Sequence, residues 1–357
     1  MISILDKYIA RHVLQAVLLA LLVLLGLDLL FAFLDELDEL GEAYTLEVIA
    51  HYLWLTLPAR LYELLPISAM LGALIGLGVL AGSSELTVMR AAGISLWRIA
   101  RAVMQPTLLL MLLVMLVGEW WVPQSAPQAN SIRAVALGKQ DELASRYGVW
   151  HREGNTFIHF NAVDSRGLIY GVSRYQFDEQ QRLVSSSYAE QAQYQDGQWL
   201  LSQVREAKLE TVEPPRWQAQ QREQEPWQTE LTPELLNLVV LDPLYLPMPG
   251  LWQYANYLQE QGLEADRYWL AFWQKMLQPL AVAALVLVGM SFVFGPLRSV
   301  SMGQRVISGV IVGVAFRLAQ DLLGPVVTLS GISPLLAVLG LLVLCLGLGS
   351  WLLKRVR

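Results

Sequence analysis

Charged side chains lie inside or at the ends of several long apolar stretches, where an isolated charge is costly in a membrane. Arg317 and Asp321 are one helical turn apart in one of these stretches, so they can neutralise each other. The others are Asp28, Arg60, Glu63, Glu119, Arg267 and Lys275. Two interpretations stay open: these side chains reach the membrane surface as snorkelling residues, or they hold the head group of a large amphiphile between helices.

The sequence lacks the motifs of common catalytic sites. No HExxH pattern accompanies the four histidines, His12, His51, His151 and His159, and Cys345 is the only cysteine. There is no GxxxxGK[ST] nucleotide loop and no GxSxG or SxxK nucleophile motif. We therefore expect no metal, no cofactor and no catalytic site in this chain, and the formal net charge of -6 argues against a nucleic-acid partner.

Six apolar stretches reach or approach the roughly 20 residues that a helix needs to cross a bilayer. They span 13–33, 58–81, 98–122, 271–297, 306–327 and 334–353. A mean hydropathy of +0.42 and a charged fraction of 16% agree with this reading. The sequence predicts an integral membrane α-helical protein with six transmembrane helices, in which 1–122 and 266–357 flank an inserted segment at 123–265.

Basic residues are concentrated on one side of the predicted membrane. They are Lys7, Arg11, Arg90, Arg98, Arg101, Arg298, Arg305, Lys354, Arg355 and Arg357. The loop at 35–57, on the opposite side, has no Lys or Arg but carries Asp35, Glu36, Asp38, Glu39, Glu42 and Glu47. The positive-inside rule then predicts two cytoplasmic termini and an external inserted segment. The first span, which lacks a cleavage pattern, is expected to be a retained helix.

The inserted segment changes from helical to alternating periodicity near residue 147. Stretches 147–153, 156–162, 168–177, 183–194 and 199–209 read as strands separated by turn signals. They predict an all-β domain, as a sandwich, a jelly roll or an open barrel. The polar run at 218–224 is expected to be an edge or a long connection, and 250–261 an amphipathic helix. An exposed sheet edge would suit strand addition by a similar domain, whereas protected edges would make the domain self-contained.

A short cytoplasmic loop joins the second and third spans at about 83–94. Ser83 or Ser84 can cap a helix there, and Gly93 can end it. Leu86, Val88, Met89 and Ile94 give this helix an apolar component. It can lie on the lipid head groups or dock into a cytoplasmic protein.

In its predicted spans, inserted segment and loop helix, the sequence resembles the LptF/LptG permease subunits of the lipopolysaccharide export transporter over its whole length. The residues that carry the resemblance are Leu5-Asp6-Lys7-Tyr8-Ile9, Ser84-Glu85-Leu86-Thr87-Val88-Met89 through Ala92-Gly93, Gly118-Glu119-Trp120, Pro123-Gln124, Leu231-Thr232-Pro233 and Leu241-Asp242-Pro243. The run Phe294-Gly295-Pro296-Leu297-Arg298-Ser299 is closer to the LptG branch than to LptF.

The resemblance implies a half-transporter of the bacterial inner membrane, with an inserted periplasmic domain that is jelly-roll-like. Its partners would be an LptF-like permease, an LptB-like ATPase dimer that binds ATP and Mg, an LptC-like single-span protein and an LptA-like periplasmic protein. Lipopolysaccharide would be the substrate. The loop helix would be the coupling helix, so Glu85, Leu86, Met89 and Arg90 are the expected ATPase contacts, with Glu85 meeting a basic groove.

The resemblance also implies a lipid cavity lined by the first and fifth spans. The candidate cavity residues are Asp28, Phe33, Arg60, Glu63, Arg133, Lys275, Arg317 and Asp321. One departure concerns the base that LptG relatives can carry near the outer end of the first span, because no Lys or Arg occurs here between Arg11 and Arg60. Arg60, Arg133, Lys275 or the partner subunit would supply it instead.

Three other functions compete with lipid transport. A mechanical or signalling subunit would drive a periplasmic partner without moving lipid. An intramembrane enzyme would need a nucleophile, metal set or catalytic dyad that the sequence does not display. An LptF-type role would replace the LptG-type one.

Overall fold

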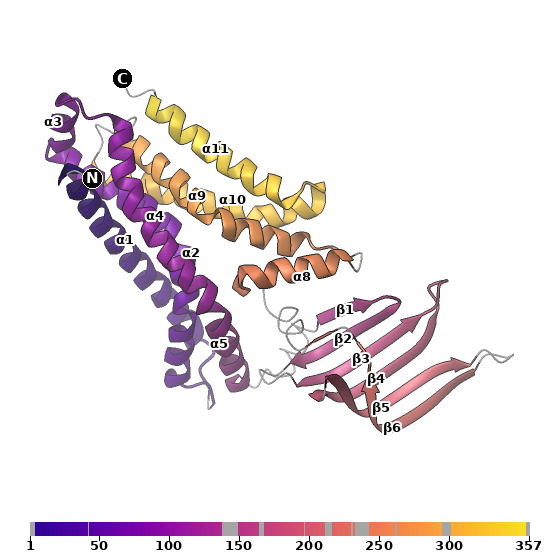
Figure 1. Cartoon of the computed structure of the whole chain (residues 1–357). Helices are drawn as coiled ribbons and strands as arrows, with labels where there is room; N and C mark the ends of the chain where they lie inside the picture. Colours follow the sequence, from indigo (N-terminus) through magenta and orange to yellow (C-terminus); the bar gives the residue numbers. More distant parts are fainter. Residues whose placement is uncertain are drawn as a thin grey trace. The chain divides into compact units, whose positions relative to one another are not determined.

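The computed structural model describes residues 4–41, 43–137, 149–163, 168–195, 197–210, 216–229, 231–232, 243–260, 263–294 and 301–354 (Figure 1). The chain divides into two compact units. The helix bundle comprises Met1–Asp38, Leu53–Ala126 and Asp266–Arg357, and the inserted unit comprises Glu39–Tyr52 and Pro127–Ala265.

The bundle contains six helices long and apolar enough to cross a membrane, counted over the described residues. They are α1 (Ile4–Leu37), α2 (Leu46–Gly82), α4 (Leu96–Trp120), α9 (Asp266–Phe294), α10 (Met302–Ser330) and α11 (Pro334–Lys354). The six predicted spans are therefore confirmed. Most of these helices extend beyond the predicted apolar stretch, because polar residues at a helix end continue the backbone hydrogen bonding that the apolar part begins.

Two ends of the bundle can be defined from the chain path. At the insertion end α1, α4 and α10 finish and α2, α9 and α11 begin; at the terminal end lie the two chain termini, as Figure 1 shows. Helices α2 and α9 are largely buried, whereas α1, α10 and α11 are buried on only a small part of their surface. The bundle core therefore sits around α2 and α9.

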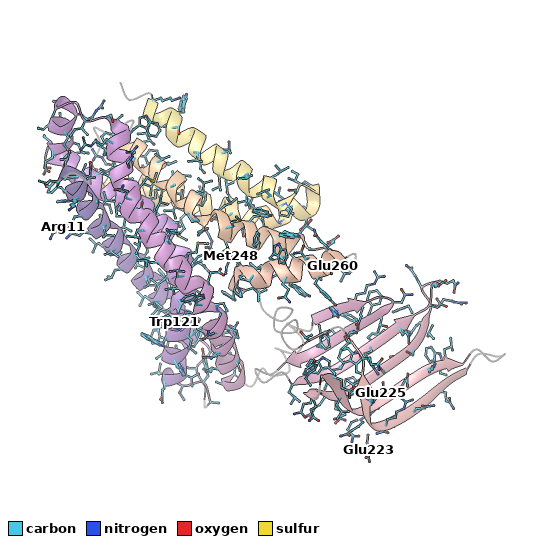
Figure 2. The ribbon with its side chains drawn as sticks, in the orientation of Figure 1. Arg11, Trp121, Glu223, Glu225, Met248 and Glu260 are labelled. Carbon is cyan, nitrogen blue, oxygen red and sulfur yellow. The ribbon has the colours of Figure 1, made fainter. Side chains whose placement is uncertain are left out.

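Exposed tryptophans mark both ends of the bundle. Trp54, Trp120 and Trp121 lie toward the insertion end, and Trp97 and Trp351 lie near the terminal end; Trp121 is labelled in Figure 2. Tryptophan is enriched at both membrane–water interfaces because its ring is apolar and its N–H is polar. Two such groups, separated by apolar helix surface, agree with a membrane-spanning bundle.

Within the described residues, the inserted unit contains one six-stranded antiparallel sheet whose neighbours follow the chain order. Its strands are β1 (Val149–Glu153), β2 (Thr156–Val163), β3 (Ile169–Phe177), β4 (Leu183–Gln195), β5 (Gln198–Glu210) and β6 (Arg216–Trp227). Among the described residues, helix α8 (Met248–Glu260) lies wholly in this unit, and α5 (Val122–Ala136) and the first turns of α2 lie partly in it. The predicted amphipathic helix is thus confirmed as α8, while helix α5 was not foreseen.

The sheet curls until its two halves face each other. The rings of Phe160 on β2 and Trp227 on β6 have centroids 6.2 Å apart. In a flat sheet these strands, four positions apart, would be separated by about 19 Å, since neighbouring strands lie about 4.8 Å apart. Trp199 closes the same apolar core, and its indole N–H donates to the carbonyl of Leu231 at 2.6 Å.

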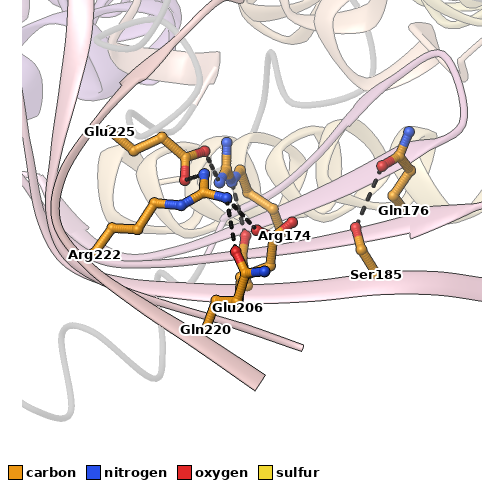
Figure 3. Close-up of polar contacts among 8 residues, drawn as sticks. Arg174, Gln176, Ser185, Glu206, Gln220, Arg222 and Glu225 are labelled. Atoms are coloured by element: carbon orange, nitrogen blue, oxygen red, sulfur yellow. Dashed lines mark hydrogen bonds and ion pairs between the residues drawn. The ribbon is translucent and has the colours of Figure 1, made fainter. Parts of the chain in front are cut away.

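A polar cluster fills the other part of the curled interior (Figure 3). Arg174 on β3 donates to Glu225 on β6 at 2.8 Å, although two strands lie between them in the sheet. Arg174 also donates to Ser187, and Arg222 donates to the second oxygen of Glu225 at 3.0 Å. These bonds connect the two halves of the sheet directly.

The inserted all-β domain is therefore confirmed, as a curled open sheet and not as a closed barrel. Its meander order differs from the Greek-key crossovers of a standard jelly roll, while its two facing halves share the enclosed core of that fold. The polar run at 218–224 is part of the edge strand β6. The predicted turn at 164–167, the diproline at 214–215 and the runs 233–242 and 295–300 lie outside the described residues.

Candidate functional site

Helix α2 forms ion pairs with the helix on either side of it. Arg60 pairs with Asp28 of α1. Three residues further along α2, Glu63 accepts a hydrogen bond from Arg317 of α10 at 3.0 Å. Arg317 also lies 3.4 Å from Asp321, so the predicted pairing within α10 is present but shares the guanidinium with α2. Five of the predicted cavity residues are thus brought together in two clusters along one helix.

A third interhelical pair is more deeply buried. Lys275 of α9 donates to Glu119 of α4 at 3.1 Å, and their side chains are only 5% and 14% exposed. The ammonium nitrogen also lies 6.0 Å from the centre of the Tyr62 ring on α2, at the distance of a weak cation–π contact. The ion pair joins α9 to α4, and the Tyr62 contact adds α2. The ammonium group of Lys275 is therefore enclosed by side chains of three central helices.

Two predicted cavity residues lie apart from these pairs. Phe33 is half-buried on α1. Arg133 belongs to the inserted unit, where its guanidinium carbon lies 5.8 Å from the centre of the Tyr52 ring.

The short helix α3 (Glu85–Ala91), predicted at about 83–94, is attached to the bundle by its apolar side. Leu86 and Met89 are buried in the bundle core, at 3% and 8% exposure, while Val88 is 67% exposed. The helix ends as the sequence predicts: Gly93 has φ +84°, and Ile94 donates its N–H to the carbonyl of Met89 at 3.1 Å. The surface that α3 presents therefore includes Glu85, Val88 and Arg90, and Leu86 and Met89 hold it in place.

The start of α3 differs from the predicted serine cap. Ser84 occupies the N-cap position in a left-handed conformation, and its side chain makes no capping hydrogen bond. Ser83 instead donates to the Glu85 carboxylate at 2.9 Å. Hydrogen bonds from Tyr8 and Ser83 lower the pKa of Glu85, with burial opposing and His12 assisting. The carboxylate is thus ionised at neutral pH.

The amino-terminal turns of α1 connect α3 to the rest of the bundle. Tyr8 contacts Glu85 of α3, and Asp6 accepts a hydrogen bond from Arg98 of α4 at 3.2 Å. A displacement of α3 would therefore act on α1 through Tyr8, and on α4 through the bond between Asp6 and Arg98. Tyr8, Asp6 and Tyr62 were not predicted as functional residues; the resemblance motif that contains Asp6 and Tyr8 was the one available signal.

The described residues include no group of three or more His, Cys, Asp or Glu side chains that could hold a metal ion. His151, one of the two strand histidines, is buried and bonded to Tyr257 of α8, with Nε2 and the hydroxyl oxygen 3.1 Å apart. Burial lowers the pKa of His151, against a smaller opposing effect of Glu153. Histidines on predicted strands are by default expected to face solvent, and this expectation is wrong for His151.

Comparison with known proteins identifies the family. The family model described as "Lipopolysaccharide export system permease LptF/LptG" matches residues 7–355. This chain belongs to the LptF/LptG family. It is 37% identical over 356 residues to the lipopolysaccharide export system permease protein LptG of Escherichia coli K12, covering 99% of this chain and 98% of that protein. It is 35% identical over 360 residues to LptG of Haemophilus influenzae, covering all of both chains.

These relatives confirm the LptG-like reading of the sequence. The relatives are named permease proteins, and the six apolar helices agree with a multi-pass protein of the inner membrane. The structure of this LptF/LptG family member also shows how a base reaches the outer part of the first span, which itself has no Lys or Arg there. Arg60 of α2 brings a guanidinium to Asp28 of α1, so a base reaches the first span although that span has none near this position.

Proposed function

We propose that this chain is one permease subunit of an ABC transporter that extracts lipopolysaccharide from the inner membrane and passes it to a periplasmic bridge of β-jelly-roll domains. A separate ATPase dimer supplies the energy. The observation that carries the proposal is α3, a short helix whose apolar side is buried in the bundle while Glu85, Val88 and Arg90 remain on its surface. A helix held in this way can transmit force from a partner to α1 and α4.

The proposed topology follows from the charge distribution. Both termini and α3 lie in the cytoplasm, where Lys and Arg are concentrated, and the inserted unit lies in the periplasm. An LptB-like dimer, carrying ATP and Mg, docks on α3. An LptF-like permease completes the membrane part, an LptC-like helix joins it, and LptC-like and LptA-like periplasmic domains receive the lipid.

The transport cycle requires the ATPase to favour one arrangement of the helices over another, since a partner shifts an equilibrium only by its differential affinity. Binding at α3 pulls on Tyr8 and, through Asp6 and Arg98, on α4. The lipid cavity borders α1 and α10, and the paired charges of α2 lie beside it. Closure of that cavity expels the lipid outward.

Replacing Glu85 tests the docking role of α3. We expect Glu85→Ala to weaken co-purification of the ATPase with the permease pair, or to leave hydrolysis uncoupled from transport in proteoliposomes. Tyr8→Phe is the matched control, because it removes the hydrogen bond to Glu85 but keeps the carboxylate. Complete ATPase co-purification and full transport in Glu85→Ala would refute the docking role. An equal loss of ATPase co-purification in Tyr8→Phe would assign the loss to the internal bond instead.

Photocrosslinking distinguishes a lipid transporter from a signalling subunit. A photoreactive residue at Phe33, on the proposed cavity wall, should label lipopolysaccharide in the assembled complex. The same residue at Trp217, exposed on β6, is the control for random labelling. Labelling at both positions to the same extent, or at neither, would contradict lipid transport by this bundle.

A further inference from the structure

Helix α8 is the last helix of the inserted unit before the chain returns to the bundle. In Figure 1 it lies beside β1, the first strand of the sheet, and a hydrogen bond joins the two elements. One side of the helix is buried, and its residues follow one another at helical spacing: Leu251, Tyr254, Ala255 and Leu258. The helix is therefore held in one orientation.

Two aromatic contacts join α8 to the middle of β1. The hydroxyl oxygen of Tyr257 lies 3.1 Å from Nε2 of His151, and the two rings are nearly parallel with centroids 5.8 Å apart. Within α8, the ring of Tyr254 stacks on that of Tyr257 at 6.1 Å. Because His151 is only 3% exposed, loss of the Tyr257 hydroxyl would leave a buried nitrogen without this partner.

Strand β1 is held from outside the sheet as well as from within it. Among the described strands only β2 pairs with it, so β1 is an edge strand. Glu153, at the end of β1, accepts a hydrogen bond from Thr229 at 2.8 Å, and Thr229 in turn accepts one from the N–H of Leu231. Leu231 is also the residue whose carbonyl accepts the indole N–H of Trp199 in the aromatic core. The Glu153–Thr229 bond thus closes a seam between the first strand and the segment that follows the last strand.

The link from α8 to the membrane helix α9 is short, and part of it is bonded to α8. Five residues, 261–265, separate the two helices, whereas twelve, 137–148, separate α5 from β1. Leu263 donates its N–H back to the carbonyl of Leu258 at 2.8 Å, and Ala265 is 4% exposed. A displacement of α9 therefore reaches α8 with little slack.

Helix α9 is itself tied to the helices that follow α3. The buried Lys275–Glu119 pair joins α9 to α4, and Arg98 near the start of α4 donates to Asp6 of α1. Coupling between distant sites is carried by chains of packed and hydrogen-bonded groups that have two arrangements. The contacts from α1 through α4 and α9, followed by the link to α8, form such a chain up to β1.

We propose that α8 carries movements of α9 into the inserted unit and that Tyr257 positions β1 through His151. A displacement of α9 moves α8, α8 moves β1, and the bond between Glu153 and Thr229 breaks or forms. The seam of the curled sheet is therefore open in one state of the transport cycle and closed in the other. Tyr257 is a positioning residue, because it acts on the seam only through His151. This inference rests on the proposed function, because the ATPase supplies the movement.

Amide hydrogen exchange tests whether Tyr257 docks α8. In the full complex in nanodiscs, Tyr257→Phe keeps the ring but removes the hydroxyl. Exchange of the α8 amides at 251–258 should become about fivefold faster, which corresponds to the roughly 1 kcal/mol of one hydrogen bond. Tyr188→Phe is the matched control, because it removes a hydroxyl from an exposed tyrosine of β4. Unchanged exchange in Tyr257→Phe, or an equal acceleration in Tyr188→Phe, would overturn the docking role.

Distance measurements test the movement of the seam. After Cys345→Ser removes the only native cysteine, spin labels at the exposed Trp150 and Gln228 span the seam. Labels at the exposed Glu190 of β4 and Trp217 of β6 form a reference pair away from β1. A non-hydrolysable ATP analogue with Mg, added to the full complex, should shift the first distance and leave the second unchanged. An unshifted seam distance, or equal shifts in both pairs, would refute the movement.

The Tyr257→Phe variant in the same complex separates transmission from folding. The seam shift and the amount of lipid transported per ATP should both fall, while ATP hydrolysis and recovery of the assembled complex stay unchanged. A full seam shift with full transport in this variant would refute the role of Tyr257. Lipid labelling at Phe33 and normal ATPase binding without a seam shift would remove this inference alone, whereas loss of that labelling and binding would remove the proposed function as well.

Discussion

Replacing Gly72 by alanine tests whether α1 and α2 touch through their backbones. The new Cβ would stand 2.3 Å from the Cα and 2.5 Å from the backbone nitrogen of Val17. Carbon atoms in ordinary contact lie about 3.5–4.0 Å apart. Because backbone atoms cannot rotate away as a side chain can, the two helices have to separate by more than about 1 Å to restore normal contact distances.

The size of the effect follows from a matched variant. Alanine at Gly26, also in a helix of the bundle, meets nothing within 4 Å. Both substitutions gain the same helix propensity of about 1 kcal/mol, so this gain cancels in the comparison. Overpacking typically costs about 1–3 kcal/mol. We therefore expect Gly72→Ala to lower the free energy of unfolding by about 1–3 kcal/mol relative to Gly26→Ala.

Equilibrium unfolding in mixed micelles, followed by tryptophan fluorescence as sodium dodecyl sulfate is added, measures this difference. Both variants are compared with the unmodified chain in the same detergent. Equal unfolding free energies for Gly72→Ala and Gly26→Ala would show that α1 does not meet α2 at Val17.

Two further predictions concern charge and burial. Burial lowers the pKa of His151 in the folded state, so the folded chain favours the neutral imidazole. The contribution of this group to the free energy of unfolding is therefore complete above pH 6.5. It falls as the pH drops below 6.5, because the unfolded chain takes up the proton first. Thermal unfolding of the full chain at pH 5 and pH 7.5 measures the loss of stability between the two pH values. His151→Gln should reduce this loss, and an unchanged loss would contradict the burial of a neutral His151. Glu119→Gln should destabilise the bundle by about 3–5 kcal/mol because Lys275 keeps a buried charge, whereas Glu190→Gln on the surface should cost no more than about 1 kcal/mol. Comparable losses in these two variants, measured by the same unfolding titration, would contradict the burial of the Lys275–Glu119 pair.

Apolar composition made the membrane helices predictable from the sequence. A bilayer selects for long apolar stretches whatever their neighbours are, so each span is a local property. Strands β1 to β5 were predictable for a similar reason, since one buried face produces alternation. Strand β6 is mostly polar and is exposed over 217–224, so it shows no alternation, and Trp227 near its end enters the core.

The ion pairs were only half predictable. The charged residues stood out against their apolar surroundings, but their partners lie far along the chain: Asp28 is 32 residues from Arg60, and Glu63 is 254 residues from Arg317. The sequence suggested Asp321 as the partner of Arg317 because that pair is local. Likewise the apolar residues of α3 marked it as amphipathic, but periodicity alone does not tell whether Leu86 and Met89 face a partner or the bundle.

The order of the strands has a consequence for how the inserted unit forms during synthesis. Each strand pairs with the one made just before it, so every hairpin can close while the rest of the chain is still being made, without waiting for a distant segment. The aromatic centre is different, because Phe160 cannot meet Trp227 until the final strand has emerged. Until then the growing sheet has hydrogen-bonded strands but an unfilled interior, and its last strand is the one that completes it.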